Sequence, residues 1–203
     1  MKKRAPPKHD DHWLKKAWYF IWYDNSPLSW AVNILLAFVL IKFVIYPGIG
    51  LLFGTSLPVV AVVSTSMEHQ GNFDQWWQTH QEFYVQRNIS EQQFRTFIFV
   101  HGFNKGDIMV LIGKKPTEIT QGDVIVFQAR KPYPIIHRVV AIHDGFFETK
   151  GDNNLQQIVS LDLNEQYVTT QQLIGKAVFR IPLLGWVKIW FVDFLGLFGV
   201  PAF

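Results

Sequence analysis

Two long apolar stretches stand out from a chain that otherwise mixes apolar and polar positions. The first, LSWAVNILLAFVLIKFVIY, covers residues 28–46, and the second, PLLGWVKIWFVDFLGLFGVPAF, covers residues 182–203. As a helix with a rise of about 1.5 Å per residue, the first stretch would measure roughly 28 Å, close to the thickness of a bilayer's hydrocarbon core. We therefore predict a transmembrane anchor at 28–46 that ends before Pro47 and Gly48. The stretch at 182–203 predicts a second membrane segment, either spanning or interfacial.

Between these stretches the pattern changes to short apolar runs that follow turn-forming residues. Such runs are typical of β-strands in an antiparallel sheet. GDIMVL and GDVIVF resemble each other, since each places a Gly-Asp turn before an apolar strand, and His143-Asp144-Gly145 predicts the turn of a hairpin. The strands are expected at 56–64, 106–111, 122–127, 135–142, 146–150 and 172–182. The fold class is therefore mainly β with membrane helices, and its β domain covers residues 47–181.

One part of the β domain has a different period. Between residues 72 and 100, aromatic and other large side chains recur at spacings of three and four, which predicts an amphipathic helix. Ser90 followed by Gln93 has the form of a capping box and predicts the start of a second helix. We therefore expect a helical insert at 72–100 within the β domain.

Positive charge is concentrated before the first apolar stretch. Lys or Arg occupies positions 2, 3, 4, 8, 15 and 16, whereas none occurs from Phe43 to Gln86. This asymmetry predicts a basic cytoplasmic tail at 1–27, with the β domain on the outer face of the cell membrane. Because the tail accounts for most of the pI of about 9.1, we expect no basic face for nucleic acid.

The chain has no cysteine. Disulfide scaffolds, thiolate zinc sites and cysteine nucleophiles are therefore excluded. The histidines are scattered without the paired spacing of metal ligands, so we expect no metal site.

Three polar motifs carry the candidate chemistry. STSMEHQ (64–70) follows an apolar run, HRVV (137–140) lies in a predicted strand, and KGDNN (150–154) follows the hairpin. A serine hydroxyl is a weak nucleophile unless a neighbouring base removes its proton, and histidine can do so at neutral pH. His69 and His143 compete with the histidine of HRVV for this role, because the former is close in sequence to the serines and the latter shares strand parity.

Together with GDVIVF (122–127), which lies between the first and the second, and in this order behind an anchor, these motifs resemble type I signal peptidases of the archaeal and endoplasmic-reticulum branch. The bacterial branch has lysine where this chain has His137. The resemblance implies that Ser66 is the nucleophile, His137 the general base and Asp152 the acid that orients the imidazole. It also implies an oxyanion hole formed by the Ser64 hydroxyl and the Ser66 backbone N–H.

The function implied by this resemblance is that of a membrane-bound serine endopeptidase. It would remove signal peptides from secreted preproteins through an acyl-enzyme on Ser66, without a cofactor. Its partners would be secretory preproteins, the lipid bilayer and the translocation machinery. Two alternatives stay open: a related peptidase with another membrane substrate, and an inactive family member that serves as a membrane-anchored binding subunit.

The sequence departs from the family pattern in two places. His69 stands where relatives often carry proline. Relatives also have a second aspartate a few residues after the first, and here that position is Ile158. Asp162 is the nearest acid in sequence, and the pattern assigns it no role.

Overall fold

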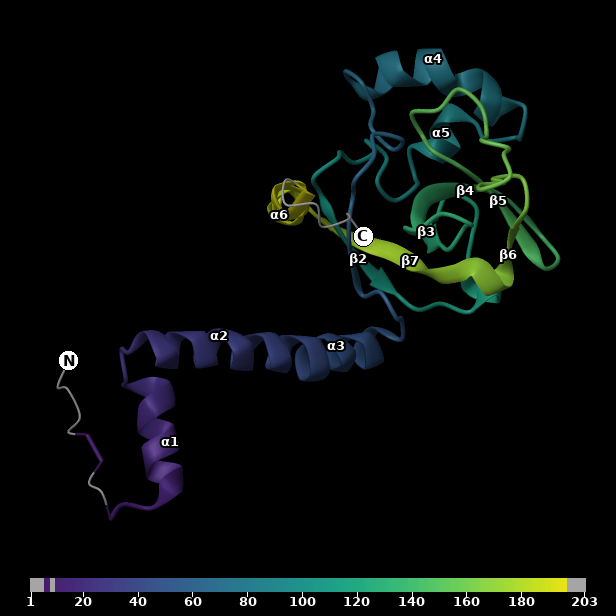
Figure 1. Cartoon of the computed structure of the whole chain (residues 1–203). Coiled ribbons are helices and arrows are strands. Elements are labelled where there is room, and N and C mark those ends of the chain that lie inside the picture. Colours follow the sequence, from purple (N-terminus) through teal and green to yellow (C-terminus); the bar gives the residue numbers. More distant parts are fainter. Residues whose placement is uncertain (1–5, 8–9, 197–203) are drawn as a thin grey trace. The chain divides into compact units, whose positions relative to one another are not determined.

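The computed structural model describes residues 6–7 and 10–196 (Figure 1). The chain forms two compact units, Met1–Ile49 and Gly50–Phe203. Residues 1–5, 8–9 and 197–203, which carry part of the predicted basic tail and of the predicted C-terminal segment, lie outside the described residues.

The first unit is helical, and its last helix continues beyond Ile49 to Phe53. Helix α1 (Trp13–Trp22) is followed by α2 (Pro27–Leu40), a π-helical turn (Ile41–Ile45) and α3 (Tyr46–Phe53). The last three form one continuous helix of 27 residues, and its most apolar 18-residue stretch has a mean hydropathy of 2.3. Within the described residues, this is the one helix that is long and apolar enough to cross a membrane, judged by length and composition.

The predicted end of this helix at Pro47 is wrong. Proline has no N–H, and in a regular α-helix its ring clashes with the carbonyl four residues earlier. The π-helical turn at Ile41–Ile45, immediately before Tyr46 and Pro47, changes the hydrogen-bonding pattern of that region. The helix therefore passes through Pro47 and Gly48 and ends at Phe53.

The second unit is built on one curled sheet of seven strands in which every neighbouring pair is antiparallel (Figure 1). The order across the sheet is β1-β2-β7-β3-β4-β5-β6. The strands are β1 (Val59–Ala61), β2 (Ile108–Ile112), β3 (Val124–Phe127), β4 (Ile135–His143), β5 (Phe146–Lys150), β6 (Val168–Thr169) and β7 (Leu173–Ile181). The predicted mainly-β class with an N-terminal apolar helix is confirmed.

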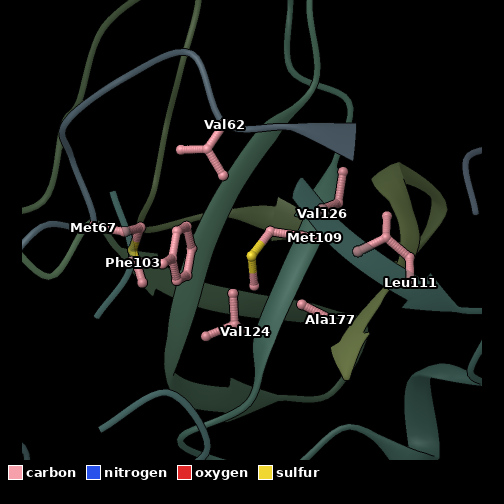
Figure 2. Close-up of a cluster of buried hydrophobic side chains, with 8 residues drawn as sticks. All are labelled: Val62, Met67, Phe103, Met109, Leu111, Val124, Val126 and Ala177. Atoms are coloured by element: carbon pink, nitrogen blue, oxygen red, sulfur yellow. The ribbon is translucent and has the colours of Figure 1, made fainter. Parts of the chain in front are cut away.

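The core of the sheet also supports the segment that carries the candidate nucleophile. Eight buried side chains form one cluster in Figure 2: Val62, Met67, Phe103, Met109, Leu111, Val124, Val126 and Ala177. Val62 and Met67 come from the segment on either side of Ser64–Ser66, and both are almost fully buried. Burying side chains of this size contributes about 1.5–3 kcal/mol each, so the polar residues between them are held at both ends.

Helices α4 (Phe73–Val85) and α5 (Glu91–Phe94) occupy the region of the expected insert. Asn72 caps α4 through a capping box with Gln75, and the face with spacings of three and four is buried. Its aromatic residues pack with Val140 of β4, so α4 and α5 cover this end of the sheet. The remaining elements are the 3₁₀ turns Pro116–Glu118 and Thr170–Gln172 and helix α6 (Trp186–Gly196).

Candidate active site

Ser66 lies in a loop that follows strand β1. Its carbonyl oxygen accepts a hydrogen bond of 2.8 Å from the Asn153 backbone N–H. The Asn153 side chain donates in turn to the Thr65 carbonyl at 3.1 Å. The loop of the KGDNN motif therefore holds the loop of the STSMEHQ motif through its backbone, and the Ser66 hydroxyl is left for other contacts.

The structure brings Ser66 and His137 together. Although 71 residues separate them in sequence, the Ser66 hydroxyl lies 2.9 Å from Nε2 of His137. His137 belongs to β4, where it pairs with Ile125 of β3, and its side chain is buried. Gly151 closes the site from behind, since a Cβ there would lie 3.0 Å from His137 Nε2 and 2.8 Å from the Ser66 carbonyl oxygen.

The other ring nitrogen of His137 contacts an acid that the sequence did not indicate. Nδ1 of His137 lies 2.5 Å from Oε1 of Glu165, a fully buried side chain. A carboxylate can only accept, so the proton of a neutral imidazole resides on Nδ1, and Nε2 is free to accept from Ser66. Glu165 thereby selects the tautomer that a general base requires.

Glu165 reaches this position because the chain doubles back after Ile158. The Glu165 backbone N–H donates to the Ile158 carbonyl at 2.9 Å, and the Ile158 N–H donates to Oε2 of Glu165 at 2.6 Å. A bridge between Val159 and Asn164 closes the loop. The carboxylate of Glu165 therefore lies directly against position 158, where the family pattern places its second aspartate. Asp162, the nearest acid in sequence, is exposed.

Asp152 does not lie where the resemblance predicts. Its carboxylate receives hydrogen bonds from Arg138 at 2.7 and 2.9 Å, from the Tyr84 hydroxyl at 3.0 Å and from His69 at 3.1 Å. Successive residues of a strand point to opposite faces, and Asp152 lies on the face of Arg138 rather than that of its neighbour His137. The expectation that Asp152 orients His137 therefore needs correction, because Glu165 makes that contact.

Asp152 is the centre of a buried charged network. Burial opposes its ionisation, but the Arg138 guanidinium and the hydrogen bond from His69 outweigh burial and hold the pKa of Asp152 well below its usual range. Burial and the charge of Asp152 raise the pKa of Tyr84 well above its usual value. The network joins α4 to the loop behind Ser66, so its evident role is to hold that loop.

The two competing histidines have other partners. The His69 ring stacks on Trp76 with centroids 3.6 Å apart and bonds to Asp152. Burial lowers the pKa of His69, and the hydrogen bond to Asp152 only partly offsets that effect. His143 is exposed and bonds to Glu148 at 3.0 Å. A β-bulge between Val139 and Ala141 interrupts the alternation of strand β4, which explains why parity with His137 does not bring His143 to the site.

The predicted oxyanion-hole residue Ser64 lies beside the nucleophile. Its hydroxyl is 3.0 Å from the Ser66 hydroxyl, and the Ser64 side chain is exposed. Among the described residues, no group of three or more His, Asp or Glu side chains could hold a metal ion. The arrangement provides a hydroxyl nucleophile, a base, an orienting carboxylate and a nearby hydroxyl donor.

Lys150 allows a test of the buried network through the pH dependence of stability. Burial lowers the pKa of Lys150 to about 8, and its ammonium donates to the Gly151 carbonyl at 3.0 Å. Between pH 8 and 10 the unfolded chain keeps a proton on this lysine that the folded chain loses, so the free energy of unfolding rises with pH. We expect Lys150→Met to lack that rise, which amounts to about 2–3 kcal/mol over the window. Urea titrations of both proteins at pH 8, 9 and 10 give the free energy of unfolding at each pH. If that free energy rose equally with pH in both proteins, the lowered pKa of Lys150 would be contradicted.

Comparison with known proteins adds independent information. The chain is similar to the signal peptidase complex catalytic subunit SEC11 of Saccharomyces cerevisiae (strain YJM789), with 33% identity over 115 residues that cover 49% of this chain and 68% of that protein. The corresponding protein of strain RM11-1a matches with the same identity and coverage. No family model matches the chain.

Proposed function

The chain belongs to the signal peptidase I family of the endoplasmic-reticulum and archaeal type, and we propose that Ser66, His137 and Glu165 carry out its reaction. It is a serine endopeptidase that cleaves signal peptides. The observation that carries the proposal is the continuous set of contacts from the Ser66 hydroxyl through both nitrogens of His137 to the Glu165 carboxylate.

The proposed reaction follows from these contacts. The Ser66 hydroxyl attacks the scissile carbonyl while Nε2 of His137 takes its proton. The imidazolium that forms is stabilised by Glu165 at Nδ1, and it returns the proton to the leaving amine. The resulting acyl-enzyme on Ser66 is then hydrolysed by a water molecule that His137 deprotonates. Asp152 takes no part in these steps and instead fixes the loop behind Ser66 through Arg138 and His69.

We assign the oxyanion hole to the Ser66 backbone N–H and the Ser64 hydroxyl, in agreement with the family pattern. Because Ser64 is exposed and lies outside the core, Ser64→Ala should leave stability unchanged. Loss of one oxyanion donor typically lowers kcat by about 10²–10³-fold. Steady-state cleavage of a preprotein gives kcat and KM separately, and a variant with kcat within about twofold of wild type would remove Ser64 from the oxyanion hole.

The substrate is proposed to bind as an added strand along β1. Strand β1 is the edge of the sheet, so one side of its backbone has no neighbouring strand within the described residues. Val59 of β1 and Val63, in the segment between β1 and Ser66, are exposed at 37% and 50%, so an extended peptide meets apolar side chains there. Backbone hydrogen bonds to such an edge supply affinity without requiring a particular sequence.

We propose that the continuous helix Pro27–Phe53 anchors the enzyme in the cell membrane. The Lys and Arg residues before it support a cytoplasmic N-terminus and a catalytic domain on the outer face. Residues 182–203 are proposed as a second contact with the bilayer; the described part includes α6, whose exposed Trp190 suits headgroup depth. Secretory preproteins would then reach the site as they leave the translocation machinery.

Cleavage of a purified preprotein by the full-length chain in detergent tests this proposal. The expected product has a single new N-terminus at the end of the signal peptide, and Ser66→Ala should give no product above background. If Ser66→Ala cleaved at the wild-type rate with the same product, another residue would be the nucleophile and the assignment would be wrong.

A further inference from the structure

Helix α1 has a wide apolar face next to the proposed membrane anchor. At 100° per residue, its apolar side chains occupy an arc of roughly 200°, while Lys15, Lys16 and Tyr19 fill the remainder. Four large side chains on the apolar arc keep more than half of their surface exposed: Trp13 (67%), Leu14 (56%), Trp18 (55%) and Trp22 (64%). A helix with this distribution is typical of segments that lie in a membrane interface.

Two side-chain hydrogen bonds fix α1 to the start of α2. The Ser29 hydroxyl donates to the Phe20 carbonyl at 2.6 Å, and the Asn33 amide donates to the Ile21 carbonyl at 2.9 Å. Both carbonyls belong to the last turn of α1, where no intrahelical partner is available. Ser29 is fully buried, so the joint is packed as well as bonded.

The joint gives α1 a direction different from that of the anchor. Ser26 and Pro27 start α2 with a new N-cap, and Figure 1 shows α1 turning sharply away from the axis of α2. If α2 crosses the bilayer, α1 is directed along the membrane surface, at the side where the N-terminus lies. The exposed apolar side chains of α1 would then be covered by a surface that runs parallel to the plane of the membrane.

The residues of α1 indicate which surface this is. Tryptophan is enriched at the boundary between headgroups and acyl chains, and three tryptophans lie on the apolar arc. Lys15 carries a positive charge on the opposite arc, and its pair with Asp11 is exposed and therefore weak. Lys and Arg at positions 2, 3, 4 and 8 add further charge before the helix. Basic segments beside a membrane helix are attracted to anionic phospholipids.

We propose that α1 is an interfacial helix that binds the anionic headgroups of the cytoplasmic leaflet and thereby fixes the depth of the anchor. This proposal rests on the membrane anchoring by Pro27–Phe53 proposed above. The occupant of the apolar arc is the phospholipid bilayer, rather than the β domain or a second protein.

Site-directed spin labelling tests the proposal with the full-length chain. Because the chain has no cysteine, single cysteines can be introduced at Leu14 and Trp18 on the apolar arc, and at Lys15 and Tyr19 opposite. The labelled proteins are reconstituted in bilayers of phosphatidylcholine with phosphatidylglycerol, and collisions with oxygen and with a water-soluble nickel chelate report depth. Labels at Leu14 and Trp18 should lie roughly 5–10 Å below those at Lys15 and Tyr19.

A second arm tests the anionic headgroups. In bilayers of phosphatidylcholine alone, the Trp18 label should become more accessible to the nickel chelate. The double substitution Lys15→Gln with Lys16→Gln should remove this difference between the two lipid compositions. An equal depth in both lipids for the unsubstituted helix would contradict a role for anionic headgroups.

Three outcomes would overturn the proposal, and they are distinguishable. Equal access of the nickel chelate to all four positions would place α1 in water. Shielding of the Leu14 and Trp18 labels from both reagents would show that protein covers the apolar arc. A label at Leu36 of α2 controls for the anchor: if the chelate reached it freely, the proposed membrane span itself would fail, whereas a deep Leu36 label with a water-exposed Trp18 label refutes the interfacial helix alone.

Discussion

The variants Ser66→Ala and His137→Ala are expected to cleave a preprotein at least about 10⁴-fold more slowly than the wild-type enzyme. The two side chains act as one unit, because the Ser66 hydroxyl lies 2.9 Å from His137 Nε2 and has no comparable base beside it among its described contacts. Removing either one should therefore have about the same effect as removing both. Values of kcat/KM for the two single variants and the double variant measure this non-additivity.

His143→Ala is the matched control for these variants. His143 lies on the same strand as His137, but it is exposed and pairs with Glu148. Its removal should leave kcat/KM within about twofold of wild type, since exposed ion pairs contribute about 0.2–1 kcal/mol at most. If His143→Ala were as inactive as His137→Ala and remained folded, the assignment of the base would be wrong. His69→Ala is unsuitable as a control, because His69 is buried against Trp76 and Asp152.

The second large effect distinguishes the roles of two buried acids, Glu165 and Asp152. Glu165→Gln should lower kcat by about 10²–10⁴-fold with little change in KM, because the amide cannot stabilise the imidazolium of His137. Asp152→Asn should instead lower the free energy of unfolding by about 3–5 kcal/mol, since it leaves the Arg138 guanidinium buried without its charged partner. One variant is thus defective mainly in turnover and the other mainly in stability.

Two measurements on the same samples check this separation. Steady-state kinetics gives kcat and KM, and urea titration gives the free energy of unfolding. Glu165→Asp, which keeps the charge with a shorter side chain, should recover part of the activity that Glu165→Gln loses. Near-normal turnover in folded Glu165→Gln would remove Glu165 from the site. An Asp152→Asn variant that kept full stability but lost turnover would return the orienting role to Asp152.

The sheet and the two central residues of the proposed site could be predicted from the sequence because their signals are local. The runs GDIMVL and GDVIVF place a turn before an apolar strand, and both strands lie where the pattern puts them. Ser66 and His137 occur in short motifs whose order is that of a known family. In the structure, strand β4 places His137 beside Ser66, so the two motifs meet.

The orienting acid could not be predicted, because no local pattern marks it. Glu165 lies 28 residues from His137, and it reaches the imidazole only through the loop closed by Val159 and Asn164. The family motif assigns the orienting role to Asp152, whereas the fold supplies the acid from Glu165, which is hydrogen-bonded to Ile158. Asp152 shows the opposite case: its motif matches the family, but its partner is decided by which face of β4 it approaches.

The helix that continues through Pro47 is a second case in which a local sequence signal gave the wrong prediction. Proline and glycine in succession predict a helix end, and the sequence carries no mark of the π-helical turn that precedes them. The short strand β6 has only two residues, too few to show a period of two.

The most direct test of the central claim is the rate at which a serine-directed acylating probe of the penem type modifies Ser66. Intact-mass and peptide-mass measurements identify the modified residue and give the rate for each variant. The assignment of Ser66, His137 and Glu165 predicts one adduct, located on Ser66, with a rate close to wild type in His143→Ala and at least about 10²-fold lower in both His137→Ala and Glu165→Gln. An adduct on another residue, or modification of folded Glu165→Gln at the wild-type rate, would contradict it.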